Sequence, residues 1–116
     1  MPKILLLTLS LTVVVLTAVA TIVANSYFSK PLSKSEIDIA VNQARYLYNQ
    51  KKSSGEDLSL GPCLSNALLP NWVLDIAHNP RQTIDDLPQN QCPAFREGRA
   101  AHFVELDPEG NLIRAR

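Results

Sequence analysis

An uninterrupted apolar run near the N-terminus, Ile4 to Ala24, constrains this chain of 116 residues more than any other feature. The run contains no charged residue, no Pro and no Gly. As a helix of about twenty-one residues it would be roughly 30 Å long, the thickness of the hydrocarbon core of a bilayer. Its hydroxyl side chains can return their hydrogen bonds to the helix backbone; they are Thr8, Ser10, Thr12, Thr17 and Thr21. The run therefore predicts a single membrane-spanning signal-anchor helix that contacts lipid over residues 4–24.

The charged flanks of this run do not decide its orientation. Lys3 precedes it and Lys30 and Lys34 follow it, so the positive-inside rule gives nearly a tie. The N-terminal tail is too short to hold a domain, which favours an extracytoplasmic C-terminal part. The small residues that end at Ala20 also fit a signal-peptidase site, so secretion after cleavage near Ala20 is the alternative.

Two cysteines, Cys63 and Cys92, both follow the apolar run. We expect residues 1–30 to form the anchor and residues 31–116 to form one small extracytoplasmic domain. In such a domain a single cysteine pair indicates a disulfide. Closing a loop of about thirty residues would stabilise the domain by about 3–4 kcal/mol on the chain-entropy model. The alternative is two reduced thiols in a cytosolic domain.

Neither the distribution of charge nor any sequence motif identifies a reaction. Eleven basic residues balance eleven acidic ones, and the signs are interspersed. Without a basic stripe, nucleic acid is not an expected partner. The sequence has no G-x-S-x-G, no H-E-x-x-H and no Gly-rich phosphate loop, so we expect no cofactor and no resident metal. A non-enzymatic interaction or structural role at the cell envelope is the leading interpretation.

The clearest local structure after the run is an amphipathic helix over residues 34–52. Ser33 and Glu36 have the spacing of a capping box, and Leu32 and Ile37 have that of a hydrophobic staple. Apolar residues then recur with helical spacing along one face: Ile37, Ala40, Val41, Ala44, Leu47 and Tyr48.

Three further segments indicate strands. Residues 72–77 form a short apolar run between prolines, for which a short helix is the alternative. Residues 101–106 and 112–115 flank a Pro- and Gly-containing turn and predict a β-hairpin. Residues 56–71 are expected to be a loop with at most a helical turn at 65–69. The expected fold is α+β, with the amphipathic helix packed on a three-stranded antiparallel sheet and one disulfide.

A few polar residues are candidates for chemistry. Asp75 and His78 would share a face only if their segment were helical, and His102 would lie on the face of a strand. Together Asp75, His78 and His102 define an alternative function, a small exported hydrolase or metal-binding enzyme. Arg81 is placed to pair with Asp85 or Asp86 and so to order the loop that follows.

The long loop over residues 79–95 is rich in Pro, Asn and Gln and is the expected contact surface for another envelope protein or a second copy of the chain. Trp72, before the loop, and Phe95, its last residue, are the candidate aromatic anchors of that contact.

The order of the predicted elements resembles the plan of type IV pilin-like proteins. That plan has an apolar N-terminal helix, an amphipathic helix, an antiparallel sheet and a disulfide in a loop. The residues Met1–Leu7 contain neither the processing Gly nor the acidic residue of that family, and Pro31 follows the apolar run. The resemblance implies a pilin-like or pseudopilin-type subunit as a further alternative.

Overall fold

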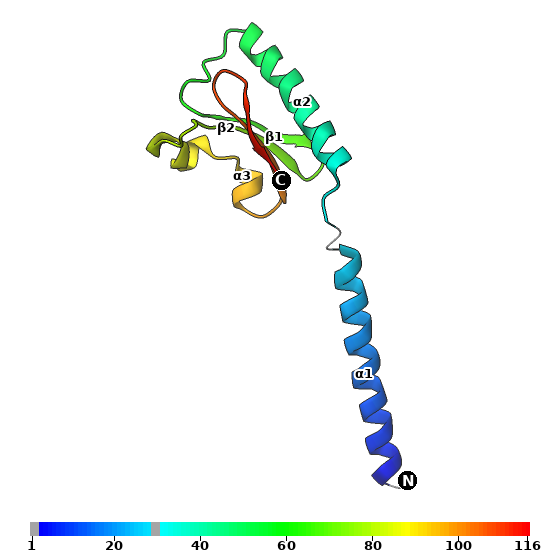
Figure 1. Ribbon diagram of the computed structural model, residues 1–116. Coiled ribbons are helices and arrows are strands. Elements are labelled where there is room, and N and C mark those ends of the chain that lie inside the picture. The colour runs from blue at the N-terminus through cyan, green and yellow to red at the C-terminus, as the bar shows by residue number, and fades with distance from the viewer. Residues whose placement is uncertain (1–2, 29–30) are drawn as a thin grey trace. The chain divides into compact units, whose positions relative to one another are not determined.

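The structure of the protein is a computed structural model that describes residues 3–28 and 31–116. The chain divides into two compact units between Pro31 and Leu32, and each unit is described here by itself. Lys30, which the sequence places beside the membrane, lies outside the described residues. Residues 3–28 of the first unit form a single helix, and the second unit is a domain of helices and strands (Figure 1).

Helix α1 runs from Lys3 to Phe28 and is long and apolar enough to cross a membrane. A signal sequence has the same length and composition. The hydroxyl groups of three threonines donate hydrogen bonds to backbone carbonyls one turn earlier, as the sequence predicts; the acceptors are Leu5 for Thr8, Leu9 for Thr12, and Val13 and Val14 for Thr17. The helix therefore satisfies these hydroxyl groups internally.

Helix α2 runs from Lys34 to Ser53 and confirms the predicted amphipathic helix. Its capping box is complete, because the Ser33 hydroxyl accepts from the Glu36 N–H at 3.2 Å and the Glu36 carboxylate accepts from the Ser33 N–H at 2.8 Å. One face of the helix is buried against the sheet through Ala40, Val41, Ala44 and Tyr48. Leu32 and Ile37 pack against the same core.

The sheet has four strands in the order β1-β2-β3-β4. Their bounds are Cys63–Leu69, Trp72–Ile76, His102–Leu106 and Leu112–Ala115. The strand expected at residues 72–77 and the C-terminal hairpin are confirmed. The prediction of three antiparallel strands is wrong on two counts: the sheet has a fourth strand, and β2 and β3 run parallel.

The fourth strand, β1, occupies a segment for which the sequence analysis predicted a loop. Its apolar residues do not alternate, because two register shifts interrupt its antiparallel pairing with β2. Leu64 and Leu68 are both buried in the core, but Asn66 between them, which regular alternation would place on the same face, is exposed. The strand reverses through a turn at Asn71, which has a φ of 70°.

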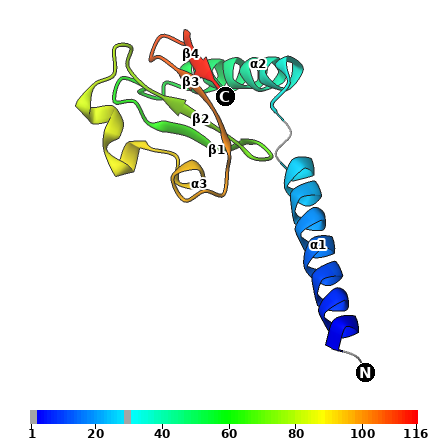
Figure 2. The ribbon, with the colours of Figure 1, turned by 60° about the horizontal axis from the view of Figure 1, so that its bottom comes forward.

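The parallel pairing requires a long crossover, residues 77–101, between β2 and β3. This crossover contains the 3₁₀ helices η1 (Thr83–Asp86) and η2 (Pro88–Asn90) and the short helix α3 (Pro93–Arg96). Figure 2 shows α2 and α3 on opposite sides of the sheet, which agrees with the two separate clusters of buried residues. The cluster on the α3 side contains Val73, Cys92, Ala94, Ala100 and Phe103.

The predicted disulfide between Cys63 and Cys92 is present, with a Cα–Cα distance of 4.9 Å. It joins the start of β1 to the residue that immediately precedes α3. The bond thus holds α3 against the sheet where the cluster of buried residues is small.

The turn between β3 and β4 is organised by Asp107, which accepts hydrogen bonds from the backbone N–H groups of Glu109 and Asn111 at 3.0 and 2.8 Å. Gly110 completes the turn with a φ of 91°, as the sequence predicts. The Tyr48 hydroxyl of α2 donates to the Pro108 carbonyl at 2.8 Å, so the helix binds this turn directly.

Gly110 is also in close contact with the ring of Tyr48. A Cβ on Gly110 would lie 2.6 Å from Tyr48 Cε1, whereas a Cβ on Gly55, which has a similar φ of 81°, would meet nothing within 4 Å. We expect Gly55→Ala to lower the free energy of unfolding by about 1–2 kcal/mol, the cost of a left-handed residue. Gly110→Ala adds overpacking of about 1–3 kcal/mol. Urea unfolding measures both variants, and equal losses would contradict the contact.

Candidate functional site

The α3 side of the sheet carries a row of side chains that the parallel pairing brings together. Val73 of β2 lies beside Phe103 of β3, and Asp75 lies beside Glu105. Side chains two residues apart on a strand point to the same face. Two carboxyl groups from distant parts of the sequence therefore lie next to an apolar floor.

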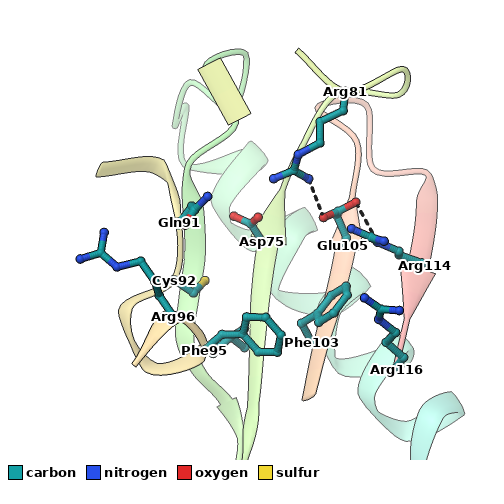
Figure 3. Close-up of a pocket in the computed structure, with 11 residues that line it drawn as sticks. Asp75, Arg81, Gln91, Cys92, Phe95, Arg96, Phe103, Glu105, Arg114 and Arg116 are labelled. Carbon is teal, nitrogen blue, oxygen red and sulfur yellow. Dashed lines mark hydrogen bonds and ion pairs between the residues drawn. The ribbon is translucent and has the colours of Figure 1, made fainter. Parts of the chain in front are cut away.

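Glu105 is only 6% exposed, and two arginines compensate its charge. Arg81, from the crossover, places Nη1 at 3.2 Å from Oε2, and Arg114 of β4 places Nε at 3.4 Å from Oε1. Arg81 also pairs with Asp86 at 2.8 Å. A single carboxylate thus connects the crossover to the last strand (Figure 3).

Asp75 is in a different electrostatic position from Glu105. Burial and, after it, the nearby charge of Glu105 raise its pKa to about 8, and Arg81 opposes them only in part. Its Oδ1 atom is buried and has no hydrogen-bond partner among the described residues. The Asp75 carboxyl is therefore protonated at neutral pH and has a polar atom without a partner.

The two phenylalanines at the site pack edge to face, with ring centroids 5.1 Å apart. Phe103 is buried, and Phe95 of α3 is 42% exposed. The guanidinium groups of Arg114 and Arg116 lie 5.2 and 5.4 Å from the centroid of the Phe103 ring. Both distances are within the range of cation–π contacts.

These groups surround a cavity of about 330 Å³. Figure 3 shows the two phenylalanine rings between Arg96 on the α3 side and Arg116 near β4. In the part of the chain that the structure describes, neither Arg96 nor Arg116 forms an ion pair with a carboxylate. The lining residues are Val73, Asp75, Arg81, Gln91, Cys92, Phe95, Arg96, Phe103, Glu105, Arg114 and Arg116.

His78 belongs to a separate network beyond the end of β2. Its Nδ1 lies 2.9 Å from Asp85 Oδ1, and its Nε2 lies 2.9 Å from the Ser59 carbonyl oxygen. Asp85 also accepts from the backbone N–H groups of His78 and Gln82. Burial alone would raise the pKa of Asp85, but these hydrogen bonds outweigh it and hold the pKa below its usual value. This network fixes the start of the crossover.

The structure brings some of the predicted candidate residues together and separates others. Asp75 and Arg81 line the cavity, and Arg81 pairs with Asp86 as expected. His102 stacks on Trp72, with ring centroids 4.9 Å apart. Trp72 belongs to the core on the α2 side. Asp75, His78 and His102 therefore do not converge: Asp75 faces the other side of the sheet, and the length of β2, about 13 Å, separates His102 from the His78 end.

The two candidate contact aromatics have different environments. Trp72 is buried in the core, whereas Phe95 lies partly exposed at the cavity. The sequence analysis missed Glu105, Arg96, Arg114 and Arg116 as members of a site. The sequence signal for Glu105, Arg114 and Arg116 is the alternation of charged and apolar residues near the C-terminus, which does not reveal the partner strand. Arg96, in α3, has no such signal.

The comparisons with known proteins give no family. The chain matches no model of a protein family, no curated protein and no solved structure. Among residues 3–28 and 31–116, no group of three or more His, Cys, Asp or Glu side chains is arranged to hold a metal ion. The interpretation of the site therefore depends on its own geometry.

The raised pKa of Asp75 predicts how stability depends on pH. Between pH 3.8 and about 8 the folded protein holds a proton on Asp75 that the unfolded chain has released. The contribution of Asp75 to the free energy of unfolding is therefore fully present below pH 3.8. It decreases as pH rises above that value, by at most about 1.4 kcal/mol per pH unit for one proton. We expect the stability of Asp75→Asn relative to the wild type to increase from pH 4 to pH 8 and then to level off. A pH-independent difference in urea unfolding would contradict this prediction.

The His78 network provides a matched pair of variants. Asp85 is 1% exposed and accepts several hydrogen bonds, so Asp85→Ala should lower the free energy of unfolding by about 2–5 kcal/mol. The side chain of Asp86 is 63% exposed, and Asp86→Ala removes only its pair with Arg81, at a cost below about 1 kcal/mol. Thermal unfolding of both variants measures the difference, and similar losses would contradict a structural role for Asp85.

Proposed function

We propose that this protein is a single-pass membrane-anchored recognition protein whose domain lies outside the cytoplasm. In this proposal α1 is the uncleaved anchor, and the domain binds an anionic segment of another envelope protein. The cavity on the α3 side of the sheet is the binding site. The role is non-enzymatic.

The anchor and the location have two supports. Helix α1 has the length and composition of a membrane span and satisfies the hydroxyl groups of Thr8, Thr12 and Thr17 internally. The domain contains a disulfide, a bond that persists mainly in oxidising compartments. An extracytoplasmic domain on a transmembrane helix accounts for both features.

One observation carries the binding role: two guanidinium groups that form no ion pair with any carboxylate of the described residues flank an aromatic pair at the cavity. Arg81 and Arg114 are occupied by Glu105, whereas Arg96 and Arg116 keep their charge available. Arginine is suited to such a site because its planar donors match carboxylates and its face stacks on aromatic rings. Phe95 adds exposed apolar surface that a partner would cover.

Photo-cross-linking in intact cells tests this proposal. A benzoylphenylalanine at position 95 probes the cavity, and the same residue at Tyr46, which is exposed on α2, is the control. We expect an adduct with an envelope protein from position 95 only, with the cross-linked peptide being acidic. Arg96→Gln and Arg116→Gln together should reduce the adduct yield at least tenfold, the effect of about 1.4 kcal/mol.

Several outcomes would contradict the proposal. An adduct that is insensitive to the two arginine substitutions would exclude the cavity as the binding site, and an adduct between two copies of this chain would replace the partner by self-association. A membrane-impermeant thiol reagent, applied to intact cells after reduction, checks the location of Cys63 and Cys92. Labelling only after cell lysis would place the domain in the cytoplasm.

A further inference from the structure

We infer that the cavity binds a carboxylate group, and that Asp75 is protonated in the complex and donates its O–H to that carboxylate. This inference rests on the proposed function, because it names the chemical group that the recognition site accepts. The occupant is a carboxylate that is attached to an apolar or aromatic group of a partner protein.

The first support is the unequal state of the two neighbouring acids. Glu105 is saturated by Arg81 and Arg114, at 3.2 and 3.4 Å. Asp75, its partner in the parallel register, has a buried oxygen that forms no hydrogen bond with any described group. Such an atom is costly to bury unless something binds it, and the cavity is where a ligand could reach it.

The second support is the charge of the groups around the cavity. Arg96 and Arg116 are cationic and lack carboxylate partners within residues 31–116, so they repel a cation and attract an anion. An anion beside Asp75 is stable only if Asp75 is neutral, and a neutral carboxyl group supplies the donor that a second carboxylate accepts. A phosphate dianion would place its additional charge near the ionised Glu105, which disfavours it.

The third support is the aromatic pair. Phe95 and Phe103 form a wall of the same cavity, and Phe95 is partly exposed. A ligand that carries an aromatic or aliphatic group next to its carboxylate would cover this wall while the anion meets Asp75 (Figure 3). Free inorganic anions lack that apolar group.

The mechanism fixes the direction of the pH dependence. The charged groups that act on Asp75 are Glu105 from β3 and Arg81 and Asp85 from the crossover, and Arg114 of β4 pairs with Glu105. The Asp75 carboxyl loses its proton in the free protein above about pH 8, so binding then requires uptake of one proton. Affinity should be constant below that pH and fall up to tenfold per pH unit above it.

Binding of a matched pair of small probes to the full-length protein in lipid nanodiscs tests the inference. N-acetylphenylalanine has the carboxylate and the ring, and N-acetylphenylalaninamide has the same ring without the charge. We expect millimolar binding of the acid, measured by shifts of the arginine side-chain NMR signals, and at least tenfold weaker binding of the amide. The Cγ signal of Asp75 should show that its apparent titration moves to higher pH when the acid is bound.

The variant Asp75→Asn tests whether titration of the Asp75 carboxyl group causes the pH dependence of binding. The amide of Asn can still donate a hydrogen bond, so this variant should bind the acid but lose the decrease in affinity above about pH 8. Asp38→Asn, on the exposed face of α2, is the matched control and should keep the wild-type pH profile. The spectrum of each variant shows whether the domain is folded.

Three results would overturn the inference: no binding of the acid, equal binding of the acid and the amide, or an unchanged pH profile in Asp75→Asn. None of these three results affects the cross-link from position 95, which tests the proposed partner independently. If that cross-link is absent while the acid still binds, the proposed protein partner is rejected, but the inference that the cavity binds a carboxylate stands.

Discussion

The parallel pairing of β2 with β3 is the interaction on which the rest of the domain depends. It places Asp75 beside Glu105 and Val73 beside Phe103, which creates both the polar and the apolar parts of the cavity. Parallel strands need a long connection, and here that connection becomes a wall of the site. The segment from residue 77 to residue 101 carries Arg81, Phe95 and Arg96 to the α3 side of the sheet.

The two faces of the sheet are stabilised in different ways. On the α2 side, a helix of 20 residues covers a large apolar core. On the other side the helical pieces are short and the buried cluster is small, so apolar burial contributes less. The Cys63–Cys92 disulfide and the hydrogen bonds around Asp85 hold that side in place. A thin layer fixed by covalent and polar contacts leaves room for a cavity next to the sheet.

The elements that the sequence predicted are those whose signals are local. Helix α2 has its capping box and helical spacing within one segment, and the C-terminal hairpin has its turn residues between its strands. Strand β1 was missed because its bulges destroy the alternation that identifies a strand. Asp75 and Arg81 were recognised as polar candidates, but Glu105 and Arg114 were not, because only a pairing of distant segments makes them neighbours. The function predicted from the sequence, an anchored interaction protein, stays a proposal.

Glu105 connects the two sides of the cavity, since it contacts Arg81 on the crossover and Arg114 on β4. The Glu105 carboxylate therefore helps to fix the positions of two guanidinium groups that line the cavity. The Glu105 backbone belongs to the central strand β3, which pairs with β2 on one side and with β4 on the other. Without this one acid, Arg114 would lose its carboxylate partner and Arg81 would keep only Asp86, so the wall that the crossover forms would no longer be tied to the last strand.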